Sequence, residues 1–538
     1  MRSPHAPVVV ICDDVGGGPV PLRLGELVAL LRRELSGAAL LVLPEICETP
    51  EVLVDALAAT EPRRVVVGCR RASQRRGELL AGLRRAGAAA ACIDVIDLQP
   101  TVGCTEQVAL EQSVALVSAG LARVVHTDIE APVKERTSLS VGGVSRRSFL
   151  RGPNKARRFI AVWRSERCTG CTAGVAWTAC VLACPHGALR REAGRVVVDG
   201  DRCNGCGACV SACSRGAFAF PGAEVEGLGA AAAVLVAAIR RGGFATGVAI
   251  ACQHSNSVPS VGELCLALRV PSLEMVTAGW LLQLVGAAVG VLVVACEDED
   301  CKQRADDLGH FLDDFARALE YSNGVAASES TRRPGSDGTV RGVMSGPDEL
   351  LGQRSVPAMS ALGQTQIELR EPQATMQALG ALAALDPNRT GWRVEGAGCS
   401  LGVVSIEPGS CSLCEVCVGV CHTGALRAEP DMNGSLRLSV DFGLCTACGA
   451  CGASCPEAAI TLERAVDGAL VTAGRRAVAT LPAVACEICG APLAGRASPA
   501  VLRRRPGDSH PVLTTGTNST CADCRLGGHS VKATHPRG

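Results

Sequence analysis

Cysteine is the residue type that most constrains how this chain folds. Thirty of its 538 residues are cysteine, and most of them occur in Cys-x2-Cys groups. Small secreted domains held by disulfides have a higher share of cysteine, whereas paired spacings of this kind are typical of metal ligands. The chain is therefore expected to bind metals or metal clusters, in a compartment reducing enough to keep its thiols available.

Two segments, 160–222 and 403–463, form an internal repeat of such groups. In the second copy a Cys-x2-Cys-x2-Cys-x3-Cys run occurs twice, and Pro456 follows the last cysteine. This spacing resembles that of bacterial two-cluster ferredoxins, in which the fourth cysteine of each run binds the other run's [4Fe-4S] cluster. The resemblance implies two crossed ligand sets: Cys411, Cys414, Cys417 and Cys455, and Cys445, Cys448, Cys451 and Cys421. Structural zinc is the alternative.

The first copy departs from this spacing at one place, because eight residues separate Cys171 from Cys180. An inserted loop explains the departure, since the run from Cys180 through Cys184 to Pro185 keeps the helical exit of the motif. The same crossing implies two further [4Fe-4S] ligand sets: Cys168, Cys171, Cys180 and Cys213, and Cys203, Cys206, Cys209 and Cys184.

The first part of the chain, 1–130, alternates short apolar runs with amphipathic segments, which predicts a βαβ domain with a parallel sheet. The expected strands are Val8 to Cys12, Ala39 to Leu43, Arg64 to Gly68 and Ala90 to Val95. The expected helices are Leu24 to Leu35, Glu51 to Thr60, Gln74 to Ala86 and Thr105 to Ala122. Alternation within the fourth strand points Cys92 into the core.

Four further cysteines follow strands or precede a helix of this domain: Cys12, Cys47, Cys69 and Cys104. The carboxyl ends of parallel strands share one edge, so these thiols are expected to lie together, with buried thiols that bind nothing as the alternative. Their sequence contexts resemble the amino-terminal domain of heterodisulfide reductase A, which implies a further [4Fe-4S] cluster there. The chain departs from that family at Asp13-Asp14, which replaces a usual second cysteine, and by the extra Cys92.

The flavin domain of that family is missing. The glycine groups at 396–402 and 16–18 lack the spacing of a dinucleotide-binding loop. We therefore expect no bound flavin or nicotinamide.

A second α/β segment, 240–321, places Cys252 after one expected strand and Cys296 and Cys301 after another. With Val270-Pro271-Ser272 upstream, the pattern resembles the delta subunit of methyl-viologen-reducing hydrogenase, which implies a [2Fe-2S] cluster. Ser272 stands where that family has a cysteine, so Cys265 or the Ser272 hydroxyl would be the fourth ligand, and an empty scaffold is the alternative. The acidic residues 297–300 would lower the potential of a cluster there.

The C-terminal segment, 480–538, carries two separated Cys-x2-Cys pairs: Cys486, Cys489, Cys521 and Cys524. Paired knuckles of this type predict a tetrahedral zinc ribbon, with a single iron as the alternative. Three connecting segments complete the domain organisation: a basic linker at 131–159, a flexible linker at 322–364 and a short helix-strand connector at 365–402.

Charge and composition narrow the choice of partners. Lys and Arg together number 53, as do Asp and Glu together, so the formal net charge is zero. Aromatic residues make up 2% of the chain. The balanced charge and the scarcity of aromatic residues argue against nucleic-acid binding. The longest apolar runs are too short to span a bilayer. The sequence around Arg146-Arg147 matches the residue pattern of twin-arginine export signals, but no apolar region follows it. We therefore expect a cytoplasmic protein.

These observations predict an α/β multidomain protein with two 2[4Fe-4S] modules and a zinc ribbon. The expected function is to relay single electrons as a subunit of a heterodisulfide reductase or hydrogenase-like complex, between partners that include flavin, reductase or dehydrogenase subunits. Two alternatives are a reductase whose amino-terminal cluster binds substrate and a non-enzymatic iron-sulfur and zinc scaffold. No catalytic residue is predicted, because His254, His422 and His510 have the sequence contexts of surface or loop residues.

Overall fold

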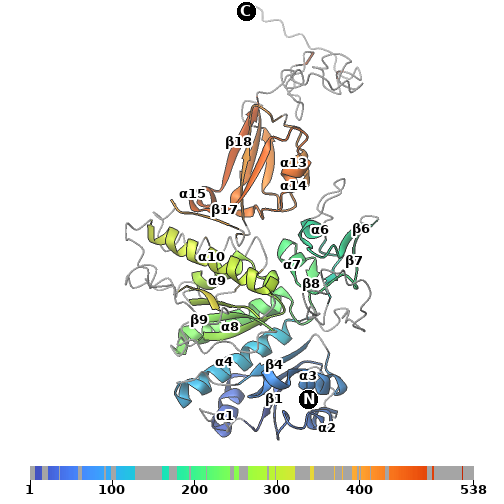
Figure 1. The fold of residues 1–538 in the computed structure, drawn as a ribbon, viewed down its shortest axis with the longest axis vertical. Helices are drawn as coiled ribbons and strands as arrows, with labels where there is room; N and C mark the ends of the chain where they lie inside the picture. The colour runs from blue at the N-terminus through green and yellow to red at the C-terminus, as the bar shows by residue number, and fades with distance from the viewer. Residues whose placement is uncertain are drawn as a thin grey trace, which may run out of the picture.

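The fold is described from a computed structural model. It describes residues 6–14, 22–35, 37–58, 63–89, 92–98, 104–127, 160–168, 179–192, 195–213, 215–242, 247–253, 265–287, 290–296, 299–321, 340–344, 391–396, 401–411, 413–430 and 435–481, with 367, 369, 379, 399, 488, 489 and 524. Figure 1 shows the described elements, with the amino-terminal α/β domain, a second α/β domain and the second cysteine-rich module following one another along the long axis.

The amino-terminal domain is a parallel sheet in the order β2-β1-β3-β4. Its strands are β1 (Val8–Cys12), β2 (Ala39–Leu43), β3 (Val65–Cys69) and β4 (Ile93–Asp97). Its helices are α1 (Leu24–Glu34), α2 (Glu51–Ala58), α3 (Ala72–Arg85) and α4 (Glu106–Val125). The parallel α/β sheet predicted from the alternating pattern is present.

Successive side chains of a strand point to opposite faces, and this gives the domain two apolar cores. Val9 and Ile11 of β1 pack with α1 and α4 on one face. Val8, Val10 and Cys12 pack with α2 and α3 on the other face. The cysteine at the end of β1 therefore faces α2 and α3.

The fourth strand begins later than the sequence predicts. Cys92 lies before β4 instead of inside it, because its amide donates to the carbonyl oxygen of Ala89 at 2.8 Å and closes a turn. The side chain is nevertheless fully buried. The predicted range, Ala90 to Val95, is thus displaced along the chain.

The second α/β domain has a sheet in the order β10-β9-β11-β12. Its strands β9 (Gly247–Cys252), β10 (Cys265–Val270) and β11 (Gly290–Val294) are parallel, and β12 (Val340–Met344) runs antiparallel to β11. Its helices are α8 (Val225–Gly242), α9 (Ala278–Gly286) and α10 (Glu299–Tyr321), with the 3-10 turn η2 (Leu273–Met275).

Two predicted boundaries of this domain differ from the structure. Helix α8 starts before residue 240 and packs on β9 and β10, so it belongs to the domain. Strand β12 lies inside the segment 322–364, which the sequence predicts as a flexible linker. The segment is rich in Ser and Gly, so its composition gives no indication of the short strand that forms by pairing with β11.

Helices α4 and α8 join the two α/β domains and lie side by side (Figure 1). Gly227 of α8 permits this close approach, because a Cβ there would lie 2.9 Å from the carbonyl oxygen of Arg123. Arg123 of α4 is bound on both sides, by Asp94 at 3.6 Å and by the carbonyl oxygen of Gly222 at 2.8 Å. A single arginine thus ties the first sheet to the segment that precedes α8.

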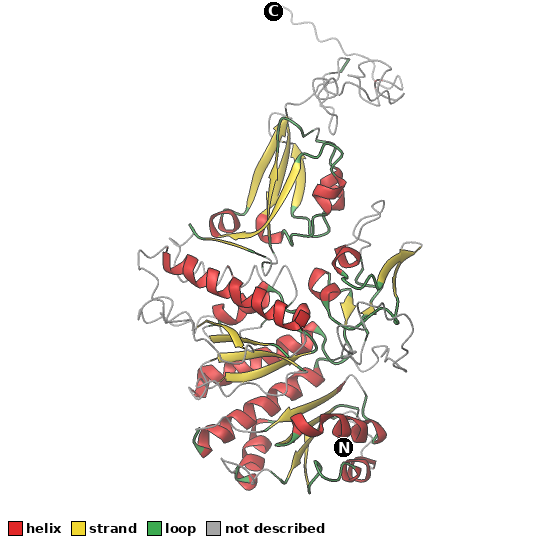
Figure 2. Cartoon of the chain, viewed as in Figure 1, coloured by secondary structure: helices red, strands yellow, loops and turns green. Residues whose placement is uncertain are grey.

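The first cysteine-rich module, called module 1 below, consists of short elements (Figure 2). Strands β5 (Val162–Trp163) and β8 (Phe218–Ala219) form one antiparallel pair, and β6 (Leu189–Glu192) and β7 (Arg195–Val198) form the other. Its helices are α6 (Ala179–Ala183) and α7 (Ala208–Ala212). Its buried residues belong to the same apolar core as the second α/β domain.

The second module, module 2, has two antiparallel sheets, β13-β17-β14 and β15-β16-β18. Its strands are β13 (Arg393–Glu395), β14 (Gly402–Ile406), β15 (Leu426–Pro430), β16 (Leu436–Asp441), β17 (Ile460–Asp467) and β18 (Arg475–Leu481). Its helical elements are α13 (Val416–Val420), η5 (Phe442–Leu444), α14 (Ala450–Ser454) and α15 (Gly468–Thr472).

Module 2 is larger than the predicted range 403–463. Strand β13, placed by sequence in the connector 365–402, pairs with β17, and β18 pairs with β16 well beyond residue 463. The cysteine spacing marks only the part of the module that carries the ligands. The added strands have no cysteines and therefore leave no such signal.

Candidate metal centres

Module 2 arranges four cysteines around one hollow. They are Cys411, Cys414, Cys417 and Cys455. Leu413 and Glu415, between the first three, both adopt positive φ, so the loop curls tightly and turns its thiols inward. This is the crossed set that the ferredoxin resemblance implies, and a [4Fe-4S] cluster fits it because the thiols surround space instead of touching one another.

The second predicted set of module 2 is also gathered. Burial, and after it the charges of the nearby Cys448 and Cys421, raises the pKa of Cys451 to about 11. Burial likewise raises the pKa of Cys445 to about 12, with the same neighbours contributing. Thiols in such positions cannot all ionise without a compensating cation, and the irons of a cluster would supply that charge.

Module 1 repeats the arrangement around a hollow of its own. The cysteines around it are Cys184, Cys203, Cys206 and Cys209. Of the other predicted set, Cys168, Cys180 and Cys213 are described, with Cys180 buried in the core that includes Cys209. Cys171 lies outside the described residues.

The closing cysteine of most runs receives a backbone hydrogen bond that the spacing does not reveal. The amide four residues later donates to Sγ of Cys184 at 3.3 Å, of Cys213 at 3.3 Å and of Cys455 at 3.4 Å. At Cys421 the Thr423 hydroxyl lies 3.6 Å from Sγ instead. Such contacts favour the thiolate form that binds iron.

His422 is a site residue that the sequence reasoning missed. Its Nδ1 lies 3.7 Å from Sγ of Cys448, and its Nε2 lies 3.5 Å from the Thr446 hydroxyl. Burial, and secondarily the charge of Arg215, lowers the pKa of His422, so the ring is neutral near pH 7. Its position directly after Cys421 was the available signal.

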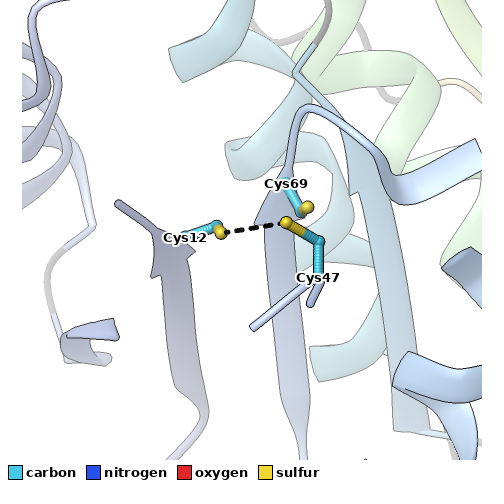
Figure 3. Close-up of side chains that lie close together, drawn as sticks. All are labelled: Cys12, Cys47 and Cys69. Atoms are coloured by element: carbon cyan, nitrogen blue, oxygen red, sulfur yellow. Dashed lines mark hydrogen bonds between the residues drawn. The ribbon is translucent and has the colours of Figure 1, made fainter. Parts of the chain in front are cut away.

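In the amino-terminal domain, three of the four predicted thiols converge (Figure 3). The sulfurs of Cys12, Cys47 and Cys69 lie within 4.8 Å of one another, and Cys12 and Cys47 are 3.9 Å apart. All three are buried and belong to the core facing α2 and α3. Cys104 packs against the core on the opposite face of the sheet and is not part of this group.

The electrostatics of this thiol trio are those of a site that needs a cation. Hydrogen bonding, first from Cys69, lowers the pKa of Cys12 to about 6 against the cost of burial. Burial and the charge of Cys12 then raise the pKa of Cys47 to about 11. One thiolate is therefore stable near neutral pH, and further ionisation requires positive charge between the sulfurs.

A second trio lies at the carboxyl ends of β9 and β11. Sulfurs of Cys252, Cys296 and Cys301 are within 4.8 Å of one another. Hydrogen bonds from Cys252 and Cys296 and burial raise the pKa of Cys301. Ser272 is fully buried just after β10, at the same edge of the sheet, and its Oγ accepts from the Glu274 amide at 3.3 Å.

Cys265, the other predicted fourth ligand, is at the wrong end of the sheet. It pairs with Gly247 at the start of β9, whereas Cys252 pairs with Val270 at the far end. Five residues of strand separate the two positions, which is on the order of 17 Å. The prediction that Cys265 is a ligand is therefore wrong, and Cys265 is a residue of strand β10 at the opposite end of the sheet.

The predicted zinc ribbon lies almost entirely outside the described residues. Cys489 is exposed and Cys524 is half-buried, while Cys486 and Cys521 are not described. The ribbon stays a prediction.

Helix α4 is the one helix, among those the structure describes, that is long and apolar enough to cross a membrane. Half of its most apolar window is buried in the protein, where it contacts α1, α8, β3 and β4. This packing accounts for its composition.

Comparison with protein families matches both modules. Residues 149–218 match the 4Fe-4S dicluster domain, and residues 438–461 match the 4Fe-4S binding domain. No curated protein matches the chain. The chain thus has two 4Fe-4S ferredoxin-type domains, which confirms the prediction of iron-sulfur modules and indicates an electron-transfer role. The matches do not extend into 8–125 or 240–321, so the resemblances stated there stay predictions.

Proposed function

We propose that this protein is an iron-sulfur subunit that relays single electrons within a heterodisulfide reductase or hydrogenase-like complex. The observation that carries the proposal is the arrangement of module cysteines into crossed sets around hollows. A [4Fe-4S] cluster exchanges one electron at a time, and the protein residues hold it, screen it and set its potential. The donor and acceptor are subunits carrying flavin or iron-sulfur centres, in the reducing cytoplasm.

Exposure of the ligands supports exchange with a partner at module 2. Cys414 is exposed, and the neighbouring Val416 is 38% exposed, which is high for a large apolar residue beside a core. Module 1 also has an exposed apolar residue beside its ligands, because Leu182 is 51% exposed. Both modules therefore offer an apolar surface at which a partner protein could exchange an electron.

Packing between the units supports internal transfer. Gly207, between two ligands of module 1, lies against Met275 of η2. The same connection contains Pro271, whose carbonyl oxygen is 3.9 Å from Sγ of Cys252. A short stretch of backbone thus connects the module 1 ligands with the second thiol trio.

Iron content tests the proposal. Chain purified without oxygen is expected to hold at least about sixteen iron atoms, four for each of four cubanes. Cys411→Ala should lose about four of them. The matched control is Cys92→Ala, which removes a buried cysteine that lies in neither module and should keep the full content. A reconstituted protein that stops at about eight iron atoms would contradict two clusters per module.

Reduction with dithionite under argon separates the relay from its alternatives. A relay has clusters that are reduced and then reoxidised only when a partner complex is added. Clusters that cannot be reduced support a scaffold. Turnover of substrate by the isolated chain supports a reductase.

A further inference from the structure

We propose that the amino-terminal thiol trio binds one tetrahedral divalent metal ion, zinc or iron(II), with Asp14 as its fourth ligand. The resemblance of this domain implies instead a [4Fe-4S] cluster on four cysteines. Three geometric observations favour the single ion: the spacing of the sulfurs, the side of the sheet on which Cys104 lies, and the position of the Asp14 carboxylate.

The sulfur spacing fits one ion. A tetrahedral ion with metal–sulfur bonds of about 2.3 Å holds its thiolates about 3.8 Å apart. Cys12 and Cys47 are 3.9 Å apart, and all three sulfurs are within 4.8 Å. In a cubane each thiolate binds a different iron, so the thiolates are held apart by the width of the cluster.

The modules provide an internal comparison. Their cysteines line two pockets. Among the described residues, groups of three thiols this tight occur only in the two α/β domains. The same molecule therefore has open thiol sets where ferredoxin domains are matched and a closed set at Cys12, Cys47 and Cys69.

Cys104 is excluded by the sheet itself. It packs against the core formed by α1 and α4, whereas the trio belongs to the core formed by α2 and α3. Its thiol does not belong to the group of sulfurs that lie within 4.8 Å of one another. A fourth ligand must come from the trio's own side.

Asp14 is on that side, two residues after Cys12. Its Oδ2 is 3.7 Å from Sγ of Cys47 but is not within 4.8 Å of all three sulfurs, so the Asp14 side chain has to turn toward the trio to complete a tetrahedral site. Asp13, by contrast, accepts a hydrogen bond from the Glu45 amide at 2.8 Å and holds the loop after β2. The two adjacent aspartates thus have different roles, and only Asp14 contacts a thiol of the trio.

Two arginines contact the site, and each also pairs with a glutamate, Arg71 with Glu48 and Arg75 with Glu78. Three thiolates and a carboxylate on a divalent ion leave two negative charges. The amide of Arg71 donates to Sγ of Cys69 at 3.4 Å, and its Nε is 3.6 Å from Asp14 Oδ2. Arg75 donates to the carbonyl oxygen of Cys47 at 2.9 Å. Such contacts orient ligands and balance charge in metal sites.

Counting metal in the full-length chain tests the nuclearity. Cys69→Ala, purified without oxygen, should contain one metal ion fewer than the parent protein by elemental mass spectrometry. The identity of the lost element, zinc or iron, names the ion. A loss of about four iron atoms would mean a cubane, and no loss would mean no site. These outcomes can be told apart even if the variant perturbs the domain, because the test depends only on which metal is lost and on how many atoms of it are lost.

Chelator competition tests the fourth ligand. Asp14→Asn keeps the shape but removes the charge and should release the ion at least about tenfold more readily. Asp14→Cys should restore retention, because a thiolate can take the same position, whereas a merely structural role would not be rescued. Asp13→Asn and Cys104→Ser are the matched controls and should retain the ion. Release from Cys104→Ser with retention in Asp14→Asn would overturn the assignment.

Discussion

His422 lies between a cluster ligand and a hydroxyl, and its protonation decides what it does there. A neutral imidazole has one N–H donor and one acceptor nitrogen. Since the sulfur of a cluster-bound Cys448 accepts hydrogen bonds, Nδ1–H donates to it and the Thr446 hydroxyl donates to Nε2. The ring therefore stabilises negative charge on the ligand without carrying charge itself.

Replacing His422 with Phe should lower the reduction potential of one cluster in module 2. A hydrogen bond to a ligand sulfur favours the reduced cluster, and its loss costs about 0.5–1.5 kcal/mol, or roughly 20–60 mV for one electron. Potentiometric titration followed by electron paramagnetic resonance measures the shift. The exposed His310 of α10 provides the control, because His310→Phe should leave all potentials in place. An unchanged or raised potential in His422→Phe would contradict the hydrogen bond.

Individual ligands differed in how well the sequence revealed them. Cys411, Cys414 and Cys417 are close in sequence, so their spacing alone indicates a shared site. Cys104 and Cys265 were assigned by their proximity to predicted elements. Their exclusion depends on which face of a sheet and which end of a strand they occupy, and these are properties of tertiary packing. His422 was missed because no spacing rule identifies a hydrogen-bond donor to a ligand.

Helices α7 and α14 are equivalent elements with different surroundings. Each begins after a glycine in the left-handed region, Gly207 with φ 91° and Gly449 with φ 75°. A Cβ at Gly207 would lie 2.9 Å from Cβ of Met275, whereas a Cβ at Gly449 would have nothing within 4 Å. Both glycines relieve the same backbone strain, but only Gly207 is also required by a contact between units.

Gly207→Ala should therefore be more damaging than Gly449→Ala. Both substitutions cost about 1–2 kcal/mol for the left-handed conformation, and Gly207→Ala costs roughly 1–3 kcal/mol more for overlap with Met275. Hydrogen exchange of η2 should increase only in Gly207→Ala. Adding Met275→Gly should reverse that increase, because it removes the Cβ atom that the new methyl group would meet. Equal effects of the two glycine variants would show that module 1 is not held at this contact.

At the element level, the strands and helices of the first domain followed from periodicity, and β1 and β2 have the predicted bounds. Strands β12 and β18 were not predicted, and for β13 the sequence predicted only that the connector 365–402 contains a strand. Each depends on a partner distant in sequence, and neither alternation nor turn residues near 393–395 indicate that β17 would pair there. The local hydrophobic pattern thus predicts strands and helices whose burial follows from their own sequence. It misses strands that form only by pairing with a segment distant in sequence.

The whole molecule combines two kinds of core. The amino-terminal domain is held mainly by aliphatic side chains on both faces of its sheet, and Cys12, Cys47 and Cys69 lie in one of the two cores. The core of module 2 includes Cys411, Cys417, Cys445 and Cys451 among its buried residues. Side chains that bind iron thus occupy positions that aliphatic residues fill in the other domain. Folding of the modules is therefore coupled to metal, because thiols without iron leave a hollow core.

Removing iron should unfold the modules before the amino-terminal domain. In protein stripped of iron under argon, amides of β15 and β16 should lose protection from hydrogen exchange, since the contacts around the ligands collapse. Amides of β1 and β3 should stay protected, because Val9, Val66 and their neighbours pack without metal. The same peptides in the iron-loaded protein are the control. Parallel loss of protection in β1 and β3 would mean that the aliphatic layers depend for stability on the modules or on an iron ion at Cys12, Cys47 and Cys69. Retained protection in β15 and β16 would mean that module 2 folds without its clusters, and its cysteines would then be ligands added to a core that is already stable.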